Sequence, residues 1–396
     1  MLTVEEASRL INENLLVLPV ELVPLDRAIG RALAQTVHAD RDLPPFHRVT
    51  MDGIAIRFQA WENGLRTFAI QATQAAGTPA LSLKNERHCI EVMTGAMLPE
   101  NTDCVIPYEQ VQIQQGTATI PSEQVTAFQN IHQQGSDAHK TEMLLSPGIK
   151  ISPAEVAVLA SVGISEVNVV SLPRIALVST GDELVEVTQQ PLPHQIRRSN
   201  DRALRAALTE MDIPSTSFHF MDERVAMEKQ LKEMMNEFDI ILLSGGVSKG
   251  KFDFVPDVLK SLGIQKIFHQ VSQRPGKPLW FGRSVHHRVF ALPGNPVSTY
   301  MCFYRYVKPW LMKCLGLTVE TPQALLATDF TFKPDLTYFL QVKVKNEKGV
   351  LMAYPISGGG SGDFANLREV DGFLELPRGQ THFQAGKVFD YYAFRQ

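Results

Sequence analysis

The sequence predicts a multidomain protein with a central three-layer α/β domain and β-rich regions on either side of it. From about residue 173 to 315, apolar runs of strand length alternate with helical patterns, which is typical of a largely parallel sheet covered by helices. Residues 58 to 137 are strand-like and rich in turns. After residue 317 the chain holds short strand candidates with few helical patterns, which favours a small β-barrel or sandwich.

Composition excludes several classes of protein. The 396 residues suggest roughly two to four domains, and 44% apolar with 20% charged residues is ordinary for a soluble chain. A net charge of −4 argues against a nucleic-acid partner. The N-terminus is not a signal peptide, and no apolar run approaches the ~18 residues of a membrane span, so we expect a cytoplasmic protein without a membrane partner. The cysteines lack metal-type spacing and indicate a reducing compartment: Cys89, Cys104, Cys302 and Cys314.

The N-terminal part begins with a predicted helix. Thr3 and Glu6 are spaced for a capping box in front of a helical apolar stripe. Pro44-Pro45 is stiff and extended and marks a domain boundary. Asp52-Gly53 predicts a tight turn into a strand, and a plain turn residue is the simpler interpretation of Asp52.

Further turns precede the central domain. Thr94-Gly95 lies at a turn where the hydroxyl and an N–H group are able to meet an anion. Asp137 follows Gly135-Ser136 in a polar loop, and it is either a ligand or, more commonly in such loops, a solvated carboxylate. Ser152-Pro153 predicts a helix start, because proline suits the first turn.

The glycine-rich stretch after the apolar run Ile240 to Leu243 organises the central domain. Residues 244 to 250 form a glycine turn, and residues 254 to 262 have helical spacing. Strand, glycine turn and helix make an anion-binding arrangement, since glycine allows close approach and a helix N-terminus favours negative charge. Phe252 stands where a P-loop needs Ser or Thr, which excludes a P-loop NTPase. Asp253 is placed to hold a metal instead; a merely tight connection is the alternative interpretation.

Other loops should meet this one at the same sheet edge. The turn Thr180 to Leu184 follows a buried-type strand and carries two carboxylates, and ligands gather at that edge of α/β sheets. Residues 274 to 278 present Arg274 and Lys277 on a proline-stiffened turn, and residues 291 to 298 open a helix with Asn295 and Ser298. With Asp253, these residues predict a pocket for an anionic ligand and a divalent metal.

Two helix boundaries and the last strands complete the prediction. We expect Asn200 to cap a helix, and Pro309 to kink a helix or end it near Lys308. Residues 358 to 362 form either an anion-contacting loop or a plain linker. The strand candidates of the C-terminal region are 324–332, 338–344, 350–354, 372–376 and 388–394.

Several motifs together resemble the MoeA family of molybdopterin molybdenumtransferases, which is related to the C-terminal domain of gephyrin. They are Thr-Gly-Asp-Glu-Leu (180–184), Ser-Gly-Gly-Val-Ser-Lys-Gly-Lys-Phe-Asp (244–253), Pro-Gly-Lys-Pro (275–278), Leu-Pro-Gly-Asn-Pro-Val-Ser (292–298), Met-Asp-Gly (51–53), Thr-Gly-Ala-Met-Leu-Pro (94–99) and Gly-Ser-Gly (360–362). Their order matches the family along nearly the whole chain.

The resemblance implies an elongated, dimerising subunit of four parts. These are a linking and dimerisation domain (1–44 plus 141–172), an inserted β-rich domain (45–140), an α/β molybdopterin-binding domain (173–316) and a C-terminal β-barrel domain (317–396). The first helix belongs either to the linking domain or to the α/β domain. The active site is expected to be shared between the subunits of a homodimer.

The resemblance also implies the chemistry. The family inserts molybdate into adenylylated molybdopterin and releases AMP, supported by Mg²⁺ or another divalent cation, and a molybdopterin adenylyltransferase is a candidate partner. The residues that match catalytic positions of the family are Asp52, Thr94, Asp137, Glu183, Asp222 and Asp253. Those that match substrate or molybdate positions are Gly245, Gly246, Ser248, Arg274, Lys277, Pro293, Asn295, Pro296, Ser298 and Ser361. Asp253 and Glu183 match metal ligands.

Three positions depart from the family pattern. Gln270 stands where many relatives have lysine, Gln341 where an arginine is expected, and Gly135-Ser136-Asp137 replaces Gly-Glu-Asp. Arg274 keeps the charge of its position and is able to grip an oxyanion with two N–H groups. A divergent paralogue, a non-catalytic pterin-binding scaffold and a different nucleotide-cleaving enzyme on the same α/β domain are the alternatives.

Overall fold

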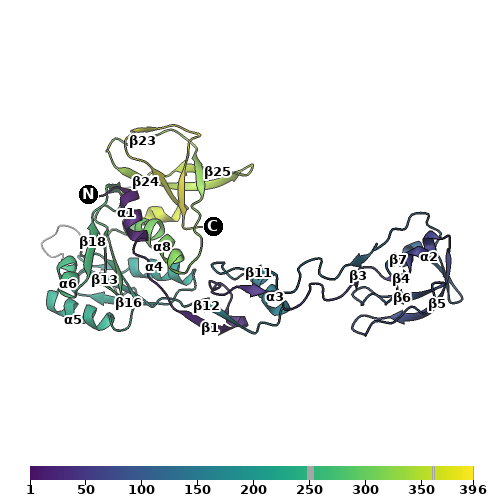
Figure 1. Cartoon of the computed structure of the whole chain (residues 1–396). Coiled ribbons are helices and arrows are strands. Elements are labelled where there is room, and N and C mark those ends of the chain that lie inside the picture. The colour runs from purple at the N-terminus through teal and green to yellow at the C-terminus, as the bar shows by residue number, and fades with distance from the viewer. Residues whose placement is uncertain (248–253, 359, 361, 396) are drawn as a thin grey trace.

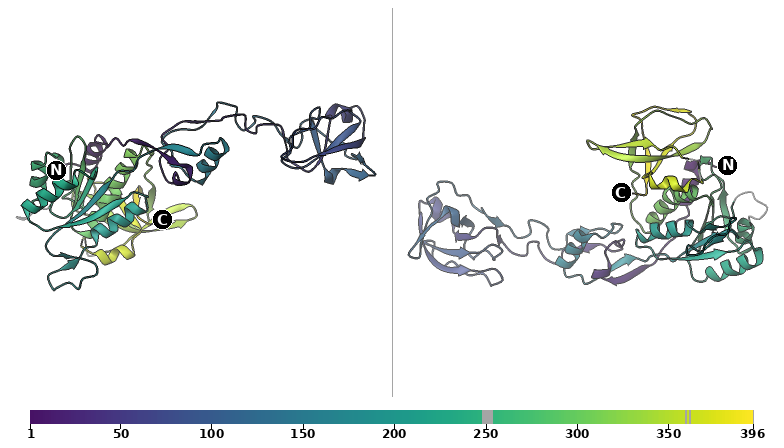
Figure 2. Two further views of the ribbon diagram at one scale, coloured as in Figure 1. Left: turned by 90° about the horizontal axis from the view of Figure 1, so that it is seen from below. Right: turned by 180° about the vertical axis from the view of Figure 1, so that it is seen from behind.

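The protein is elongated, with its two ends joined by a thin two-stranded connection. The computed structural model describes residues 1–247, 254–358, 360 and 362–395. An α/β body carries a β-barrel beside it, and a separate β-sheet lies at the far end of the connection (Figures 1 and 2). None of the helices in these ranges has the length and apolar character needed to cross a membrane.

Helix α1 (Val4–Asn12) has the predicted capping box. The Thr3 hydroxyl accepts from the Glu6 N–H at 3.2 Å, and the Glu6 carboxylate accepts from the Thr3 N–H at 2.8 Å. Val4, Ala7 and Ile11 are buried in a core shared with the α/β sheet. The first helix therefore packs on the α/β domain.

The connection is built from an outgoing and a returning segment that pair with each other. Strand β1 (Val20–Pro24) runs antiparallel to β12 (Glu166–Val170), and β2 (Val37–His38) to β11 (Met143–Leu145). Helix α3 (Pro153–Ser161) starts at Ser152-Pro153 as predicted, and Ser152 also forms a capping box with Glu155. A short 3-10 turn, η1 (Leu25–Arg27), completes this part.

The inserted region is a six-stranded sheet reached through the pair β3 (Arg48–Val49) and β10 (Ile131–His132). Its strands follow the order β7-β4-β6-β5-β9-β8. Their bounds are β4 (Gly53–Ile56), β5 (Thr67–Gln74), β6 (His88–Val92), β7 (Cys104–Pro107), β8 (Gln112–Gln114) and β9 (Thr117–Thr119). Helix α2 (Phe58–Glu62) and the turn η2 (Tyr108–Gln110) pack beside them.

The α/β body contains a six-stranded sheet of order β16-β13-β17-β21-β20-β18. The strands are β13 (Ile175–Thr180), β16 (Ser215–Phe220), β17 (Ile240–Ser244), β18 (Gln265–His269), β20 (Trp280–Arg283) and β21 (Arg288–Leu292). The strands β16, β13, β17 and β21 are parallel to one another. Strand β20 runs antiparallel to both of its neighbours, β21 and β18. The sheet is thus largely parallel, as expected.

Helices cover both faces of this sheet because each strand is apolar on both sides. Ile175 and Leu177 of β13 share a core with α4 (Asn200–Thr209), α7 (Pro296–Cys302) and α8 (Lys308–Cys314). Ala176 and Val178 share the opposite core with α5 (Arg224–Met234) and α6 (Val255–Ser261). The period-two alternation of a strand therefore produces three layers.

The helix that contains Pro309 neither ends nor simply kinks near Lys308. Helix α7 passes into a π-helical turn, η3 (Phe303–Val307), which continues directly as α8. Proline clashes with the carbonyl one α-turn earlier, and a wider turn relieves that clash. Pro309 then occupies the first turn of α8, where its missing N–H costs little.

The C-terminal region is a closed five-stranded barrel. Its strands are β22 (Gln323–Leu326), β24 (Thr337–Glu347), β25 (Val350–Pro355), β26 (Gly372–Leu376) and β28 (Val388–Ala393). They pair in the order β24-β25-β22-β28-β26, and β26 also pairs with β24, which closes the barrel. The predicted strand 324–332 is divided, since β23 (Phe330–Thr331) leaves the barrel to pair with β27 (His382–Phe383). The 3-10 turn η4 (Phe364–Arg368) lies between β25 and β26.

One short strand joins the barrel to the α/β body. Strand β19 (Gln273–Arg274) comes from the basic loop of the α/β body and runs parallel to β24, with Gln273 opposite Thr337. The basic loop predicted from the sequence is therefore an extension of the barrel sheet.

Candidate functional site

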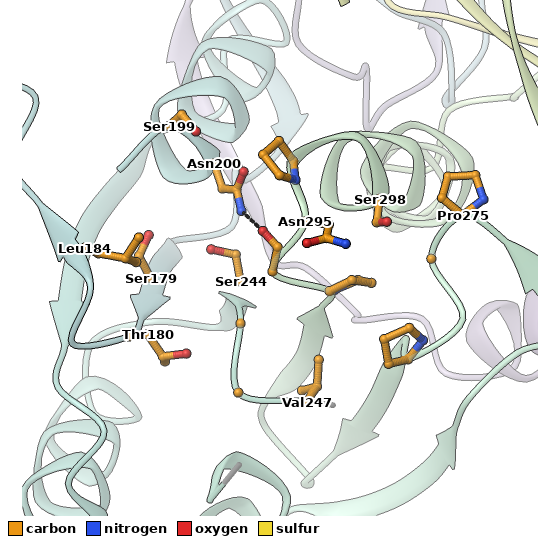
Figure 3. Close-up of a pocket in the computed structure, with 18 of the residues that line it drawn as sticks. Ser179, Thr180, Leu184, Ser199, Asn200, Ser244, Val247, Pro275, Asn295 and Ser298 are labelled. Carbon is orange, nitrogen blue, oxygen red and sulfur yellow. Dashed lines mark hydrogen bonds between the residues drawn. The ribbon is translucent and has the colours of Figure 1, made fainter. Parts of the chain in front are cut away.

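A pocket lies where three parallel strands end at one edge of the α/β sheet. In the sheet register Ser179 of β13 lies opposite Ser244 of β17, which lies opposite Leu292 of β21. The three strands therefore stop at one level, and the loops that follow them surround a common space (Figure 3). This is the edge at which the sequence predicted that the loops converge.

The pocket has a volume of about 660 Å³, which suits a ligand of cofactor size. Ten of the predicted site residues line it: Glu183, Asp222, Gly245, Gly246, Arg274, Lys277, Pro293, Asn295, Pro296 and Ser298. The sequence interpretation missed other lining residues, among them Ser179, Thr180, Arg197, Arg198, Ser199, Asn200, Ser244, Gln273 and Leu336. Predicted residues Ser248, Asp253 and Ser361 lie outside the described residues.

The glycine turn after β17 brings bare backbone to the pocket. Gly245 and Gly246 have φ angles of +99° and +68°, in the left-handed region that favours glycine. A Cβ atom on Gly245 would lie 2.7 Å from the Thr180 Oγ1 atom, so only glycine fits beside β13. That Thr180 hydroxyl is buried and has no hydrogen-bond partner among the described residues, which leaves it available to a ligand.

The loop after β21 is held from two sides. The Asn200 Nδ2 atom donates to the Gly294 carbonyl at 2.7 Å (Figure 3), and the Thr299 hydroxyl donates to the Pro293 carbonyl at 2.5 Å. The prediction that Asn200 caps a helix is wrong, because Ser199 is the N-cap residue and Asn200 starts α4. Ser298 is buried in the first turn of α7 and lines the pocket.

The basic loop contributes positive charge at the wall beside the barrel. Arg274 and Lys277 are exposed and line the pocket from either end of the Pro275-Gly276 turn. The Gln273 side chain beneath them is buried, and its Nε2 atom donates to the Gly276 carbonyl at 2.9 Å. The two cations are thus carried on a fixed turn.

Carboxylates gather at the opposite wall. Glu183 and Asp222 follow β13 and β16 and line the pocket, and the Asp222 N–H donates to Asp182 Oδ1 at 2.9 Å, which joins the two turns. The Glu183 carboxylate lies over Gly181, where an added Cβ atom would come within 2.5 Å of its Oε2 atom. Hard carboxylate oxygens suit Mg²⁺. Within the described ranges, no three His, Cys, Asp or Glu side chains gather as a complete metal site.

Arg198 is a buried cation that the sequence interpretation overlooked. It lines the pocket and is 6% exposed. Its Nη2 atom lies 2.8 Å from Glu186 and 3.7 Å from the buried Asp201, while its Nε atom has no hydrogen-bond partner in the described part of the chain. Its position just before a predicted helix was the available clue, since such residues face anions.

The predicted residues of the inserted sheet are not brought to this pocket by their own chain. Asp52 Oδ1 accepts from the Thr94 N–H at 2.6 Å and from its hydroxyl at 2.7 Å, and these bonds lower the pKa of Asp52. Asp137 Oδ1 lies 2.7 Å from His132 Nε2. Both pairs belong to the connection and sheet at the far end of the molecule (Figure 1).

Three family models match successive parts of the chain. The MoeA N-terminal region (domain I and II) matches residues 2–163, the probable molybdopterin binding domain matches residues 176–313, and the MoeA C-terminal region (domain IV) matches residues 323–394. Together they follow the order of the linking, inserted, α/β and barrel parts.

Individual relatives agree over nearly the full length. A molybdopterin molybdenumtransferase of Synechocystis sp. is 41% identical over 377 residues, which cover 93% of this chain and 94% of the relative. One from Bacillus subtilis is 30% identical, covering 95% and 90%. The crystal structure of a molybdopterin biosynthesis moeA protein from Pyrococcus horikosii superposes with a TM-score of 0.85 at 27% identity, over 100% of both chains.

Proposed function

The chain belongs to the MoeA family of molybdopterin molybdenumtransferases, and we propose that the pocket at the sheet edge is where it inserts molybdate into adenylylated molybdopterin and releases AMP. The role is that of a transferase in molybdenum cofactor biosynthesis. One observation carries the assignment to this pocket: cationic, backbone N–H and carboxylate groups from separate strand ends line a single cavity.

The anionic groups of the substrates fit the cationic wall. Arg274 and Lys277 would hold the molybdate dianion together with Ser298 and Ser361, because two cations and hydroxyl donors match a tetrahedral oxyanion. Gly246, with Ser248, would hold phosphate oxygens on N–H groups. The Gly245 N–H donates to the Leu292 carbonyl at 3.1 Å, so Gly245 would serve by bringing the turn close to the substrate. Pro293, Asn295 and Pro296 shape the wall between these two positions.

The carboxylate wall fits a divalent cation. Glu183 and Asp222 both reach the pocket, and Asp253 follows the glycine turn that borders it. We assign these three residues to Mg²⁺ or a similar ion, which would neutralise charge that develops as the bond between the phosphates of the adenylylated substrate breaks. The chain itself would orient both anions, because the cationic and carboxylate groups line one pocket.

The residues of the inserted sheet belong to the same proposal through a second subunit. Asp52, Thr94 and Asp137 are remote from the pocket of their own chain, and we assign them to the pocket of the partner in a homodimer. The division of the chain into 1–44 with 141–172, 45–140, 173–316 and 317–396 is part of this proposal. So are a cytoplasmic location and a molybdopterin adenylyltransferase as supplier of substrate.

The test is single-turnover AMP release by the purified chain with adenylylated molybdopterin, Mg²⁺ and molybdate. Glu183→Gln should slow release about 100-fold, since it removes one anionic ligand without changing shape. The matched control is Glu223→Gln, an exposed carboxylate beside Asp222 that does not line the pocket. Arg274→Met should instead raise the molybdate concentration needed for half-maximal release, with Arg283→Met on β20 as its control.

The outcomes separate the alternatives. Molybdate-dependent release that Glu183→Gln slows supports the transferase site. Tight pterin binding without AMP release under any divalent metal would leave only a scaffold. Release that is indifferent to molybdate would point to a divergent paralogue, with Gln270 and Gln341 as the first positions to restore to lysine and arginine.

A further inference from the structure

The basic loop of the pocket is held from below by a residue that does not line the pocket. Tyr306 lies in the π-helical turn η3 and is 2% exposed. Its hydroxyl donates to Gln273 Oε1 at 2.5 Å. Burial raises the pKa of Tyr306 well above its usual value, so the hydroxyl stays protonated and remains a donor.

Gln273 connects Tyr306 to both ends of the basic turn. It precedes Arg274 directly, and its Nε2 atom donates to the carbonyl of Gly276, which precedes Lys277. An amide that accepts on oxygen and donates from nitrogen has one orientation only. Because Gln273 is 1% exposed, losing the tyrosine donor would leave its oxygen buried without a partner.

The same turn is pressed against the helix that leads into η3. Gly276 has a φ of +88°, and a Cβ atom there would lie 2.7 Å from both Cys302 Sγ and Met301 Cε. Cys302 is the last residue of α7, directly before the π-helical turn. The backbone of the basic loop therefore rests on this helix without space for adjustment.

Arg305, the residue before Tyr306 in η3, contacts the barrel. Arg305 Nε donates to Glu375 Oε2 of β26 at 2.6 Å, and its guanidinium lies 4.9 Å from the centre of the Tyr392 ring of β28. Strand β26 pairs with β24, which pairs with β19 at Gln273 and Arg274. The π-helical turn thus contacts the barrel and the basic loop through two adjacent residues, and π-turns are common at functional sites.

We propose that Tyr306 is a positioning residue for the transferase reaction: acting through Gln273, it fixes the turn that presents Arg274 and Lys277 to the oxyanion. This inference rests on the proposed assignment of those two cations to molybdate. Arg305 and Glu375 hold the barrel side of the same turn. None of these side chains needs to touch substrate for the effect.

The experiment compares Tyr306→Phe with Tyr304→Phe in the single-turnover assay over a range of molybdate concentrations. Tyr304 is buried in the same turn, and its ring packs against Tyr300 and Phe394. Tyr306→Phe should raise the molybdate concentration for half-maximal AMP release about tenfold, because small displacements of binding groups are costly. Binding of adenylylated molybdopterin without molybdate and the melting temperature should stay near those of Tyr304→Phe.

A second comparison tests whether Tyr306 works through Gln273. In a Gln273→Met background, the further change Tyr306→Phe should add nothing to the molybdate requirement. Additive effects would overturn the inference, as would equal behaviour of Tyr306→Phe and Tyr304→Phe. If Gln273→Met does not fold, the comparison of the two tyrosine variants still decides.

Failure of this inference is distinguishable from failure of the proposed function. If the wild-type chain shows no molybdate-dependent AMP release, both the proposed function and the positioning role of Tyr306 are wrong. A wild-type chain with such release, together with a Tyr306→Phe variant of unchanged molybdate requirement, would remove only the positioning role.

Discussion

The Asn200 side chain and the Gly294 carbonyl, 94 residues apart in the sequence, are joined by a 2.7 Å hydrogen bond. This bond ties the first residue of α4 to the loop that follows β21. The pocket is therefore closed on this side by a contact between two of its own loops.

Breaking that bond should loosen the loop. We expect Asn200→Ala to lower kcat/KM for AMP release about tenfold, because the loop that carries Asn295 and opens α7 loses a fixed position. Asn200→Asp should be at least as harmful, since a carboxylate cannot donate to the carbonyl. Arg205→Ala is the control, because Arg205 is an exposed residue of the same helix that does not line the pocket; equal losses in all three variants would contradict the prediction.

Arg198 should be needed for stability because of Asp201. The Asp201 carboxylate is 1% exposed and is flanked by Arg198 and the more exposed Arg202. Arg198→Met removes the buried partner and should cost about 2 kcal/mol of unfolding free energy, because a buried charge loses part of its compensation. A second change, Asp201→Asn, should restore most of that loss.

The measurement uses urea unfolding followed by tryptophan fluorescence. Trp280 and Trp310 are buried in the α/β body, whereas Trp61 belongs to the inserted region. A Trp61→Phe background confines the signal to the α/β body. If the double variant is no more stable than Arg198→Met, the two side chains are not coupled.

The pKa of Asp52 should respond to Thr94. The Thr94 backbone N–H and, second, its hydroxyl lower this pKa. Thr94→Val removes the hydroxyl but keeps the N–H, so the pKa of Asp52 should rise part of the way to its ordinary value. A depressed pKa keeps the carboxylate ionised to lower pH, so an acid limb of activity governed by Asp52 should move to higher pH in Thr94→Val.

NMR titration of the Asp52 carboxyl carbon measures the shift directly. Thr102→Val serves as the control, because its hydroxyl donates to Pro99 within the same domain. An Asp52 pKa that falls or stays constant in Thr94→Val would show that the hydroxyl does not act on this carboxylate.

Mixing inactive subunits should restore activity if the site is shared. Asp52→Ala and Glu183→Ala remove residues from the far sheet and from the pocket, respectively. A heterodimer of the two has one complete site, so a statistical mixture should recover about a quarter of wild-type AMP release. Recovery requires exchange of subunits, which a tagged partner makes measurable. Full subunit exchange without any recovered release would contradict a site shared between subunits.

The cysteines should be unreactive in the folded chain. All four are buried, and burial raises the pKa of Cys89 and Cys104 to about 12 and that of Cys314 to about 11. Because the thiolate is the reactive form, Ellman's reagent at pH 8 should titrate almost none of them before denaturation and all of them after it. Rapid reaction of the native chain would contradict this burial.

Local rules predicted the parts of the fold that depend on neighbours in sequence. The capping box at Thr3 and the helix start at Ser152-Pro153 were confirmed, because both depend on residues within one helical turn. The strand-end loops were predicted to converge because parallel strands share their carboxyl edge, and the pocket confirms it. The strand pattern of the C-terminal region did not distinguish a barrel from a sandwich, since strand pairing is set by residues that are distant in the sequence.

Long-range contacts explain what the sequence did not predict. Asn200 suits a cap by type, but it is the first residue of α4, and its Nδ2 atom donates to the distant Gly294 carbonyl. Pro309 was expected to disturb its helix, yet the relief occurs one turn earlier, in η3. Gln273 is placed by Tyr306, 33 residues along the chain, and periodicity carries no information on such a partner. Arg198 is placed by Glu186 across a loop, which periodicity does not predict either.

Closure of the barrel also matters for how the chain behaves in a crowded solution. Each of its five strands has a neighbour on both sides over the closed part of the barrel, which leaves no backbone row there on which a foreign strand could add. The sheet of the inserted region ends at β8, whose residues Gln112–Gln114 are all exposed. Strand addition should therefore occur at open sheet edges such as β8 more readily than at the closed part of the barrel.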